Sequence, residues 1–275
     1  METQKELTLE ECKEIELGIL KYIRDICNAN QLKYYLTYGT LLGAIRHKGF
    51  IPWDDDIDIF MPYEDYIKFI DVMSKETGND YKLVSYEVND GYTAPLGKVI
   101  DNRTILEQSY GFIERIPLGV YVDIFVLSGA GQNEEEANKN VSHLFRLLRG
   151  WRFADSIVKK DELPIRKIIK IIRNAPYKFI GLKHYLNKIR DYREEHPFYE
   201  SKYVTQSSLT SVNNIQRNIW LQEDYGIGVD VPFENELFRA PVSYDKLLTQ
   251  YYGEYMKLPP AEKQVTQHNY KAFWA

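Results

Sequence analysis

Apolar and polar positions along the chain alternate between the helical and the strand period, which predicts a mixed α and β fold. From residue 8 to residue 29 apolar residues recur every three or four positions, and Thr8 with Glu11 has the sequence of a capping box. We therefore expect an amphipathic helix there. The aromatic and β-branched run Tyr34–Tyr38 indicates a strand that ends at Gly39.

A second alternation, of acid and hydrophobe, runs from Asp56 to Phe60 and predicts a strand with one apolar face. Asp56 and Asp58 then point to the same side. The expected fold class is α+β, a mixed β-sheet core flanked by helices, with a largely helical second half. The other expected elements are helices over residues 40–47, 63–76 and 134–153, a helix capped by Ser243 and stopped by Gly253, and strands over residues 82–88, 96–100, 105–108 and 120–127.

The chain has 275 residues, enough for one large domain or two small ones, and its 44% hydrophobic and 27% charged residues are typical of a folded protein. The unusual feature of the composition is its 22 tyrosines. No apolar run reaches the roughly 18 residues of a membrane-spanning helix, and the first residues are polar, so a cytoplasmic protein is expected. Cys12 and Cys27 supply no zinc framework, so a metal would be held by oxygen or by histidine.

Candidate chemistry begins at the turn before residue 40. Gly39 lets the backbone approach a ligand, and a helix that starts at Thr40 offers free amide donors, which together predict a phosphate cradle. Asp56 and Asp58 would repel each other without a partner, and a hard divalent cation removes that repulsion. Asp123 is our candidate for a third oxygen ligand, because it is a single carboxylate in an otherwise apolar strand.

These residues lie in segments that resemble the LicD phosphocholine transferases, which share the nucleotidyltransferase fold with the fukutin-related protein. The segments are YGTLLGAIRHKGFIPWDDDIDIFMPYEDY from Tyr38 to Tyr66, GVYVDIFVL around Asp123, and FRAPVSYDKLLTQYYGEYMKLPP followed by His268. Residues 134–236 match more loosely. The resemblance implies a nucleotidyltransferase-like catalytic core over residues 1–133, a helical and partly basic insertion over 134–236, and a C-terminal segment over 237–275 that packs back on the core.

The same resemblance implies transfer of phosphocholine from CDP-choline to a hydroxyl of a cell-surface glycan precursor, of the teichoic acid or lipopolysaccharide type, with release of CMP. The implied cofactor is Mg²⁺, with Mn²⁺ as the alternative. By motif, Asp56 and Asp58 correspond to the metal-binding pair, Asp123 to the third carboxylate, and Gly39 and Thr40 to the phosphate-contacting turn. All three carboxylates are therefore candidate metal ligands and catalytic residues, and Asp54 is expected to lie behind them.

Substrate-binding residues are expected among nearby cations and aromatic rings. Arg46 and Lys98 are our candidates for contacts to the diphosphate, although each is equally well explained as an ordinary surface charge. Quaternary ammonium groups are typically held by aromatic faces, which makes Trp53 and Tyr38 candidates for contacts to choline. Packing in the core is the alternative explanation for both rings.

Charge is unevenly distributed along the chain. Residues 159–196 contain 11 Lys or Arg and 5 Asp or Glu, a net charge of +6. Because the whole chain has a net charge of -5, the remaining residues have a net charge of -11. Ile residues recur on one side of this segment, which allows two interpretations. It is either a helical hairpin packed on the core or a pair of amphipathic helices on an anionic membrane. In the second case the helices would lie on the inner face of the membrane, near a lipid-linked acceptor. The overall negative charge argues against nucleic acid as a partner.

Two other functions remain open from the sequence. One keeps the fold and changes the chemistry, as a nucleotidyltransferase or as a transferase of ribitol phosphate from another activated nucleotide. The other is a peripheral membrane or cation-binding module in which the acids are structural.

Overall fold

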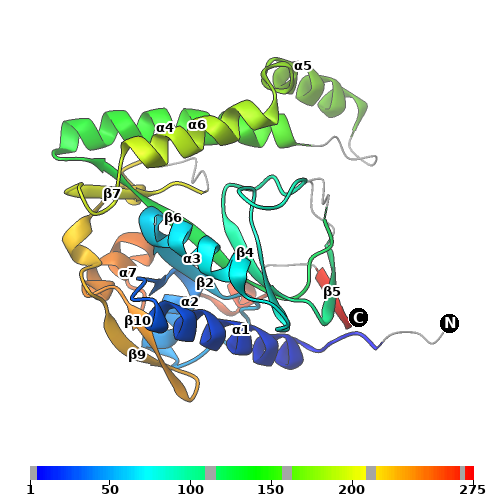
Figure 1. Ribbon diagram of the computed structural model, residues 1–275, viewed down its shortest axis with the longest axis vertical. Coiled ribbons are helices and arrows are strands. Elements are labelled where there is room, and N and C mark those ends of the chain that lie inside the picture. The colour runs from blue at the N-terminus through cyan, green and yellow to red at the C-terminus, as the bar shows by residue number, and fades with distance from the viewer. Residues whose placement is uncertain (1–4, 109–115, 157–162, 209–214, 267–269) are drawn as a thin grey trace.

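The computed structural model describes residues 5–108, 116–156, 163–208, 215–266 and 270–275, and His268 lies outside them. It confirms the expected α+β class, with one mixed sheet between helices (Figure 1). The helices are α1 (Leu9–Ala29), α2 (Tyr38–Arg46), α3 (Tyr63–Lys75), α4 (Glu134–Asp155), α5 (Pro164–Ile180), α6 (Leu182–Glu195) and α7 (Tyr244–Tyr252). The strands are β1 (Tyr35–Leu36), β2 (Asp58–Pro62), β3 (Tyr81–Val84), β4 (Gly97–Asp101), β5 (Thr104–Gln108), β6 (Tyr121–Gly131), β7 (Tyr203–Gln206), β8 (Trp220–Leu221), β9 (Val229–Phe233), β10 (Glu236–Ala240) and β11 (Tyr270–Trp274).

Helix α1 begins where the sequence predicts, because Thr8 and Glu11 satisfy each other's backbone amides. The Glu11 N–H donates to Thr8 Oγ1 over 3.2 Å, and the Thr8 N–H donates to Glu11 Oε2 over 2.7 Å. This capping box satisfies two of the amides that a helix start leaves free. Helix α2, in contrast, begins at Tyr38, two residues earlier than expected, so Gly39 lies inside its first turn.

The main sheet has the order β1-β2-β6-β4-β3, and β7 extends it beside the second half of β6. Strand β2 runs parallel to β6, while β1, β4 and β7 run antiparallel to their neighbours. The 11-residue strand β6 is the centre of this arrangement, because it pairs with β2, β4 and β7. Residues at the start of β6 therefore meet side chains from two other strands.

The two faces of the sheet carry different cores. Ile59 and Ile124 point into the larger core, which α1 and α3 cover. Phe60 and Phe125 point to the other face and pack with Trp220, Tyr225 and other large side chains. Because side chains alternate along a strand, Asp58 and Asp123 share this second, aromatic face.

A separate helical layer of α4, α5 and α6 lies beside β6 and β7, at the top of Figure 1. Residues of α4 and α6 form its core, and Arg193 of α6 is fully buried where the layer meets the sheet. The second half of the chain is thus largely helical as expected, but it also contains strands β7 to β11, which the sequence analysis did not predict. Strand β5 also leaves the main sheet and pairs with β11. The implied division at residues 133 and 236 stays a prediction.

Candidate active site

Three charged side chains from three adjacent strands form one row across the sheet. Asp58 of β2 is paired in register with Asp123 of β6, and Asp123 is paired in register with Lys98 of β4. Residues paired in this way point to the same face of a sheet. The pairing therefore brings together Asp58, Asp123 and Lys98, which are 65 residues apart at the extremes of the sequence.

Lys98 and Asp123 form an ion pair within this row. Lys98 Nζ lies 2.5 Å from Asp123 Oδ1, and both side chains are largely shielded from solvent. The same ammonium lies 3.3 Å from the centroid of the Tyr121 ring, a cation–π contact. Lys98 therefore holds one oxygen of Asp123 in place, and the carboxylate is oriented before any ligand arrives.

Asp58 is held in a different way. Its backbone N–H donates to Thr40 Oγ1 over 2.8 Å, which fixes the start of β2 against the first turn of α2. Its side-chain oxygen Oδ1 is buried and has no hydrogen-bond partner. Burial, and after it the charges of Asp56, Asp123 and Asp54, raise the pKa of Asp58 well above its ordinary value. A carboxylate oxygen buried among other carboxylates fits a divalent cation as its missing partner.

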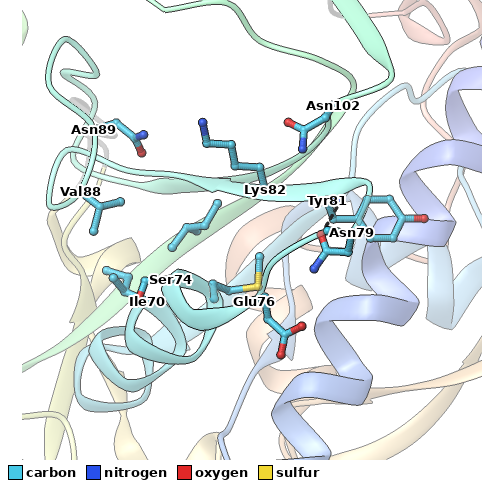
Figure 2. Close-up of a pocket in the computed structure, with 12 residues that line it drawn as sticks. Ile70, Ser74, Glu76, Asn79, Tyr81, Lys82, Val88, Asn89 and Asn102 are labelled. Carbon is cyan, nitrogen blue, oxygen red and sulfur yellow. Dashed lines mark hydrogen bonds between the residues drawn. The ribbon is translucent and has the colours of Figure 1, made fainter.

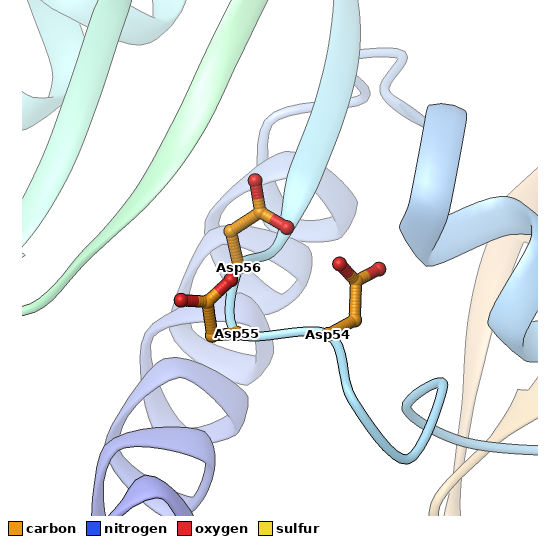
Figure 3. A group of neighbouring side chains, drawn as sticks. All are labelled: Asp54, Asp55 and Asp56. Carbon is orange, nitrogen blue, oxygen red and sulfur yellow. The ribbon is translucent and has the colours of Figure 1, made fainter. Parts of the chain in front are cut away.

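The loop before β2 brings three more carboxylates to the same place (Figure 3). One oxygen each from Asp54, Asp55 and Asp56 can lie within 4.8 Å of the other two. Figure 3 shows Asp54 directed toward α2, Asp56 at the foot of β2, and Asp55 turned toward α1. Asp54 thus lies beside the first turn of α2, and the charges of Asp56 and Asp54 both act on Asp58.

The first turn of α2 borders these acids. The carboxylate of Asp54 lies so close to the Cα of Gly39 that a Cβ there would collide with Asp54 Oδ2. Tyr38 adopts the left-handed region with a φ of 43°, which is unusual for a non-glycine residue and marks local strain. The hydroxyl of Thr40 accepts a hydrogen bond from the Asp58 backbone N–H, so Thr40 fixes the position of Asp58. The predicted contact of Gly39 and Thr40 with phosphate stays a prediction.

Arg46 and Trp53 are not members of the row, and both contact His47. Arg46 Nε donates to His47 Nε2 over 2.9 Å, and Arg46 Nη1 donates to the Tyr255 carbonyl over 2.8 Å. Burial and the charge of Arg46 lower the pKa of His47, in agreement with a neutral ring that accepts this bond. Trp53 is partly buried and meets the His47 ring edge-on. The structure thus brings Arg46 and Trp53 to the same histidine, outside the row.

Aromatic rings form a wall beside the row, on the same face of the sheet. The Tyr38 ring has its centroid 5.2 Å from that of Phe60, 5.5 Å from that of Phe125 and 5.3 Å from that of Tyr251. Tyr251 comes from α7, and it also contacts Trp220. Phe60 and Phe125 are each two residues beyond an acid of the row. The wall therefore contains rings from the first motif, from β6 and from α7, which are far apart in the sequence.

Besides Tyr251 of the aromatic wall, sequence reasoning missed two residues that the structure adds. Glu16 of α1 is buried next to Asp55 and Asp56, its Oε2 has no hydrogen-bond partner, and burial with the charges of Asp56 and Asp55 raises its pKa well above the ordinary value. Its signal is an acid within the apolar stripe of α1. Tyr252 of α7 is the second, because the charges of Asp58 and Asp54 contribute to the rise of its pKa after burial.

A surface pocket lies between the end of α3 and β3, away from the row (Figure 2). Figure 2 shows Lys82 on one side of β3 and Ile70 with Ser74 of α3 on the other. None of the residues that line it belongs to the carboxylate row. This pocket is therefore separate from the row.

A mixed sheet that presents carboxylates and a lysine beside a helix N-terminus is typical of enzymes that transfer phosphate-linked groups. A family model described as LicD/FKTN/FKRP, nucleotidyltransferase domain, matches residues 31–104, which contain the first motif and Lys98. The lipopolysaccharide cholinephosphotransferase LicD of Haemophilus influenzae is 34% identical over 272 residues, 98% of this chain and 99% of that protein. The ribitol 5-phosphate transferase FKRP of Homo sapiens is 42% identical over 45 residues, 16% of this chain and 9% of that protein.

The chain therefore belongs to the LicD family, as its motifs suggest, and it is a transferase. The match to the Haemophilus protein extends through the helical layer and the C-terminal segment. Both ends of the candidate site, the acids of the first motif and the tyrosines of α7, thus fall within the shared sequence.

Proposed function

We propose that the protein transfers phosphocholine from CDP-choline to a hydroxyl of a cell-surface glycan precursor and releases CMP. The observation that carries this proposal is the juxtaposition of the row Asp58, Asp123 and Lys98 with the aromatic wall. The row suits a diphosphate that must be bound with a cation. The partly exposed rings of the wall, Tyr38 and Tyr251, suit a quaternary ammonium group. Similarity to a cholinephosphotransferase over nearly the whole chain supports the same donor.

Mg²⁺, or Mn²⁺ in its place, would be held by Asp56 and Asp58, with Asp123 as the third ligand. The orphaned oxygen of Asp58 supports this set, because a buried carboxylate among like charges needs a positive partner. When bound, the ion neutralises charge on the diphosphate and on the leaving phosphate. A metal-free protein should therefore bind the donor weakly and transfer nothing.

The reacting groups follow from the same arrangement. The acceptor oxygen attacks the choline-bearing phosphorus, the bond from that phosphorus to the CMP oxygen breaks, and the hydroxyl proton passes to Asp123. Lys98 binds Asp123 Oδ1, which turns the other oxygen of this carboxylate toward the reaction. Gly39 and the first turn of α2 contact the donor phosphates, and Arg46 contributes positive charge from the end of α2.

A transfer assay tests the donor. The purified protein is incubated with Mg²⁺, a lipopolysaccharide- or teichoic acid-type precursor, and either CDP-choline or CDP-ribitol. We expect release of CMP from CDP-choline only when the acceptor is added. The 45-residue match to a ribitol 5-phosphate transferase makes CDP-ribitol the alternative donor, and turnover of CDP-ribitol alone would replace our proposal with that function.

The aromatic wall makes a separate prediction about choline. Aromatic faces contribute about 0.5 to 2 kcal/mol each to binding of such a cation. CDP-choline should therefore bind more tightly than CDP-ethanolamine in isothermal titration, and Tyr251→Leu should remove most of that preference while Trp53→Leu leaves it. Equal affinity of the wild-type protein for the two donors would contradict an aromatic choline site.

A further inference from the structure

Helix α5 presents an apolar face that points away from the rest of the molecule. Asn174 of α5 is buried, and its Nδ2 donates to Ser156 Oγ over 2.5 Å. The Tyr177 ring lies 5.0 Å from the Phe153 ring, and Lys178 Nζ donates to the Ala154 carbonyl over 3.4 Å. These contacts define the side of α5 that faces the protein, and Figure 1 shows α5 at the outer end of the helical layer.

The opposite side of α5 carries large apolar residues. At 100° per residue, Ile172 lies about 200° around the helix from Asn174, and its neighbours on that face follow at helical spacing. All are exposed, among them Ile172 at 69% and Phe179 at 94%. We call this surface the α5 apolar face, and it consists of Ile165, Ile168, Ile169, Ile172, Phe179 and Ile180.

The charge of α5 identifies what this face contacts. The helix contains five Lys or Arg and no Asp or Glu. A second copy of the chain would bring two such positive helices together, which disfavours a dimer through this face. An anionic lipid surface attracts the positive charge of α5 and accepts its apolar side chains. The same surface repels the acidic remainder of the molecule, so the protein would approach the membrane with α5 first. Among the described residues, no helix is long and apolar enough to cross a bilayer.

We propose that α5 docks on anionic membranes, with the α5 apolar face inserted at the level of the headgroups and the basic residues at the edge of that face, such as the exposed Arg166, against the lipid phosphates. This proposal narrows the earlier alternative in which both helices of residues 159–196 lie on the membrane. Tyr185, Leu186 and Ile189 of α6 are buried against α4, so α6 supports α5 and does not contact lipid. The inference does not depend on the proposed function, because vesicle binding is measured without turnover.

A site-specific probe tests the docking directly. Phe179→Cys is labelled with an environment-sensitive dye, and the native cysteines, Cys12 and Cys27, are buried. Ile227→Cys is the matched control, because Ile227 is 79% exposed and lies outside the helical layer. We expect a blue shift of the dye at position 179 with vesicles that contain phosphatidylglycerol, a much smaller shift with pure phosphatidylcholine, and no shift at position 227.

Vesicle flotation supplies the second readout. The double variant Ile168→Asn/Ile172→Asn should lower binding by about tenfold or more, because these side chains supply part of the inserted area. Ile227→Asn should leave binding unchanged, and both proteins should melt like the wild type. Raising the salt from about 0.1 M to about 1 M, which shortens the Debye length from about 10 Å to about 3 Å, should release the wild type.

Three results would overturn the proposal. They are absence of vesicle binding by the wild-type chain, equal dye shifts at positions 179 and 227, and a shift at 179 that grows with protein concentration without vesicles. The last result, together with a dimer in sedimentation, would assign the α5 apolar face to a second copy of the chain.

Discussion

Glu16 shows how strongly the acids of the site act on one another. It is buried in α1 beside Asp55 and Asp56, and its pKa is raised well above the ordinary value, first by burial and then by the charges of those two acids. The folded protein therefore keeps a proton on Glu16 to a higher pH than the unfolded chain does. The difference in proton uptake makes stability fall as the pH rises between the two pKa values.

Replacing Glu16 by Gln removes this loss. Below pH 4.5, the ordinary value, both states are protonated and Glu16→Gln should match the wild type. Above it, the variant should gain about 1.4 kcal/mol per pH unit relative to the wild type, up to the folded-state pKa. Urea unfolding at a series of pH values measures this gain. Glu14→Gln, on the exposed side of the same helix, is the control and should show no such slope.

Asp58→Asn should separate stability from activity. The change removes a charge that burial and three neighbouring acids disfavour, and it keeps the backbone bond to Thr40, so the metal-free variant should unfold at a higher temperature than the wild type at neutral pH. Transfer should fall to less than a few per cent. Saturating Mg²⁺ at about 100 times its Kd should stabilise the wild type by about 2.7 kcal/mol and the variant by much less.

The matched control is Asp71→Asn, which removes an exposed carboxylate from α3. It should change neither transfer nor the response to Mg²⁺. Retention of substantial activity by Asp58→Asn, or equal stabilisation of both variants by Mg²⁺, would contradict the metal-binding role of Asp58.

At the scale of elements, one buried side chain joins the helical layer to the sheet. Arg193 of α6 is fully buried, and its Nη2 donates to the carbonyls of Pro95 over 2.6 Å and Ser207 over 2.8 Å. Its Nε donates to Ser207 Oγ over 2.9 Å, and Nη1 lies 3.5 Å from Glu87 Oε1. The guanidinium thus satisfies polar groups from two segments far apart in the sequence, residues 87–95 and Ser207.

Removal of that guanidinium should be costly. Arg193→Ala leaves the Glu87 carboxylate and two carbonyls without their buried partner, so we expect a loss of about 3 to 5 kcal/mol in the free energy of unfolding. Arg190→Ala, on the same helix, breaks only an exposed pair with Glu194 and should cost less than about 1 kcal/mol. Chemical denaturation of both variants makes the comparison, and similar losses would show that Arg193 is not the link between the two layers.

The sequence predicts elements well where periodicity is strong and poorly where pairing is remote. The alternation around Asp58 and around Asp123 correctly predicts two strands, but β2 begins at Asp58, so Asp56 lies in the loop before the strand and not on its face. The alternation does not predict the parallel register of the two strands, which depends on long-range packing. The β9–β10 hairpin escapes prediction because its turn uses Glu234 at a φ of 54°, not the usual glycine, and because Pro232 interrupts the strand pattern.

The same limit applies to the site. The acids and Lys98 are recognisable because each stands out in a short apolar context. Glu16, Tyr251 and Tyr252 are not, because only the packing of α1 and α7 brings them to the start of β2. Local patterns carry no information on which distant helix closes a site.

On the scale of the whole molecule, the site and its sheet use segments from both ends of the chain. Strand β6 pairs with β7, and the aromatic face of β2 and β6 is covered by Trp220, Tyr225 and Leu247. These partners all lie beyond residue 133. The region that carries the carboxylates, Lys98 and the first turn of α2 therefore leaves a large apolar face of its sheet open if it is separated from the rest.

A fragment of residues 1–133 should accordingly fail as an independent catalytic core. We expect it to aggregate or to unfold without a cooperative transition in circular dichroism, because burial of Phe60, Phe125 and Leu127 supplies about 1.5 to 3 kcal/mol for each side chain in the intact chain. Co-expression with residues 134–275 should restore a soluble complex and transfer activity, since the fragment boundary keeps both sets of site residues. A fragment 1–133 that melts cooperatively and binds CDP-choline as tightly as the intact protein would instead show that the acids, not the later aromatic segments, determine both fold and donor binding.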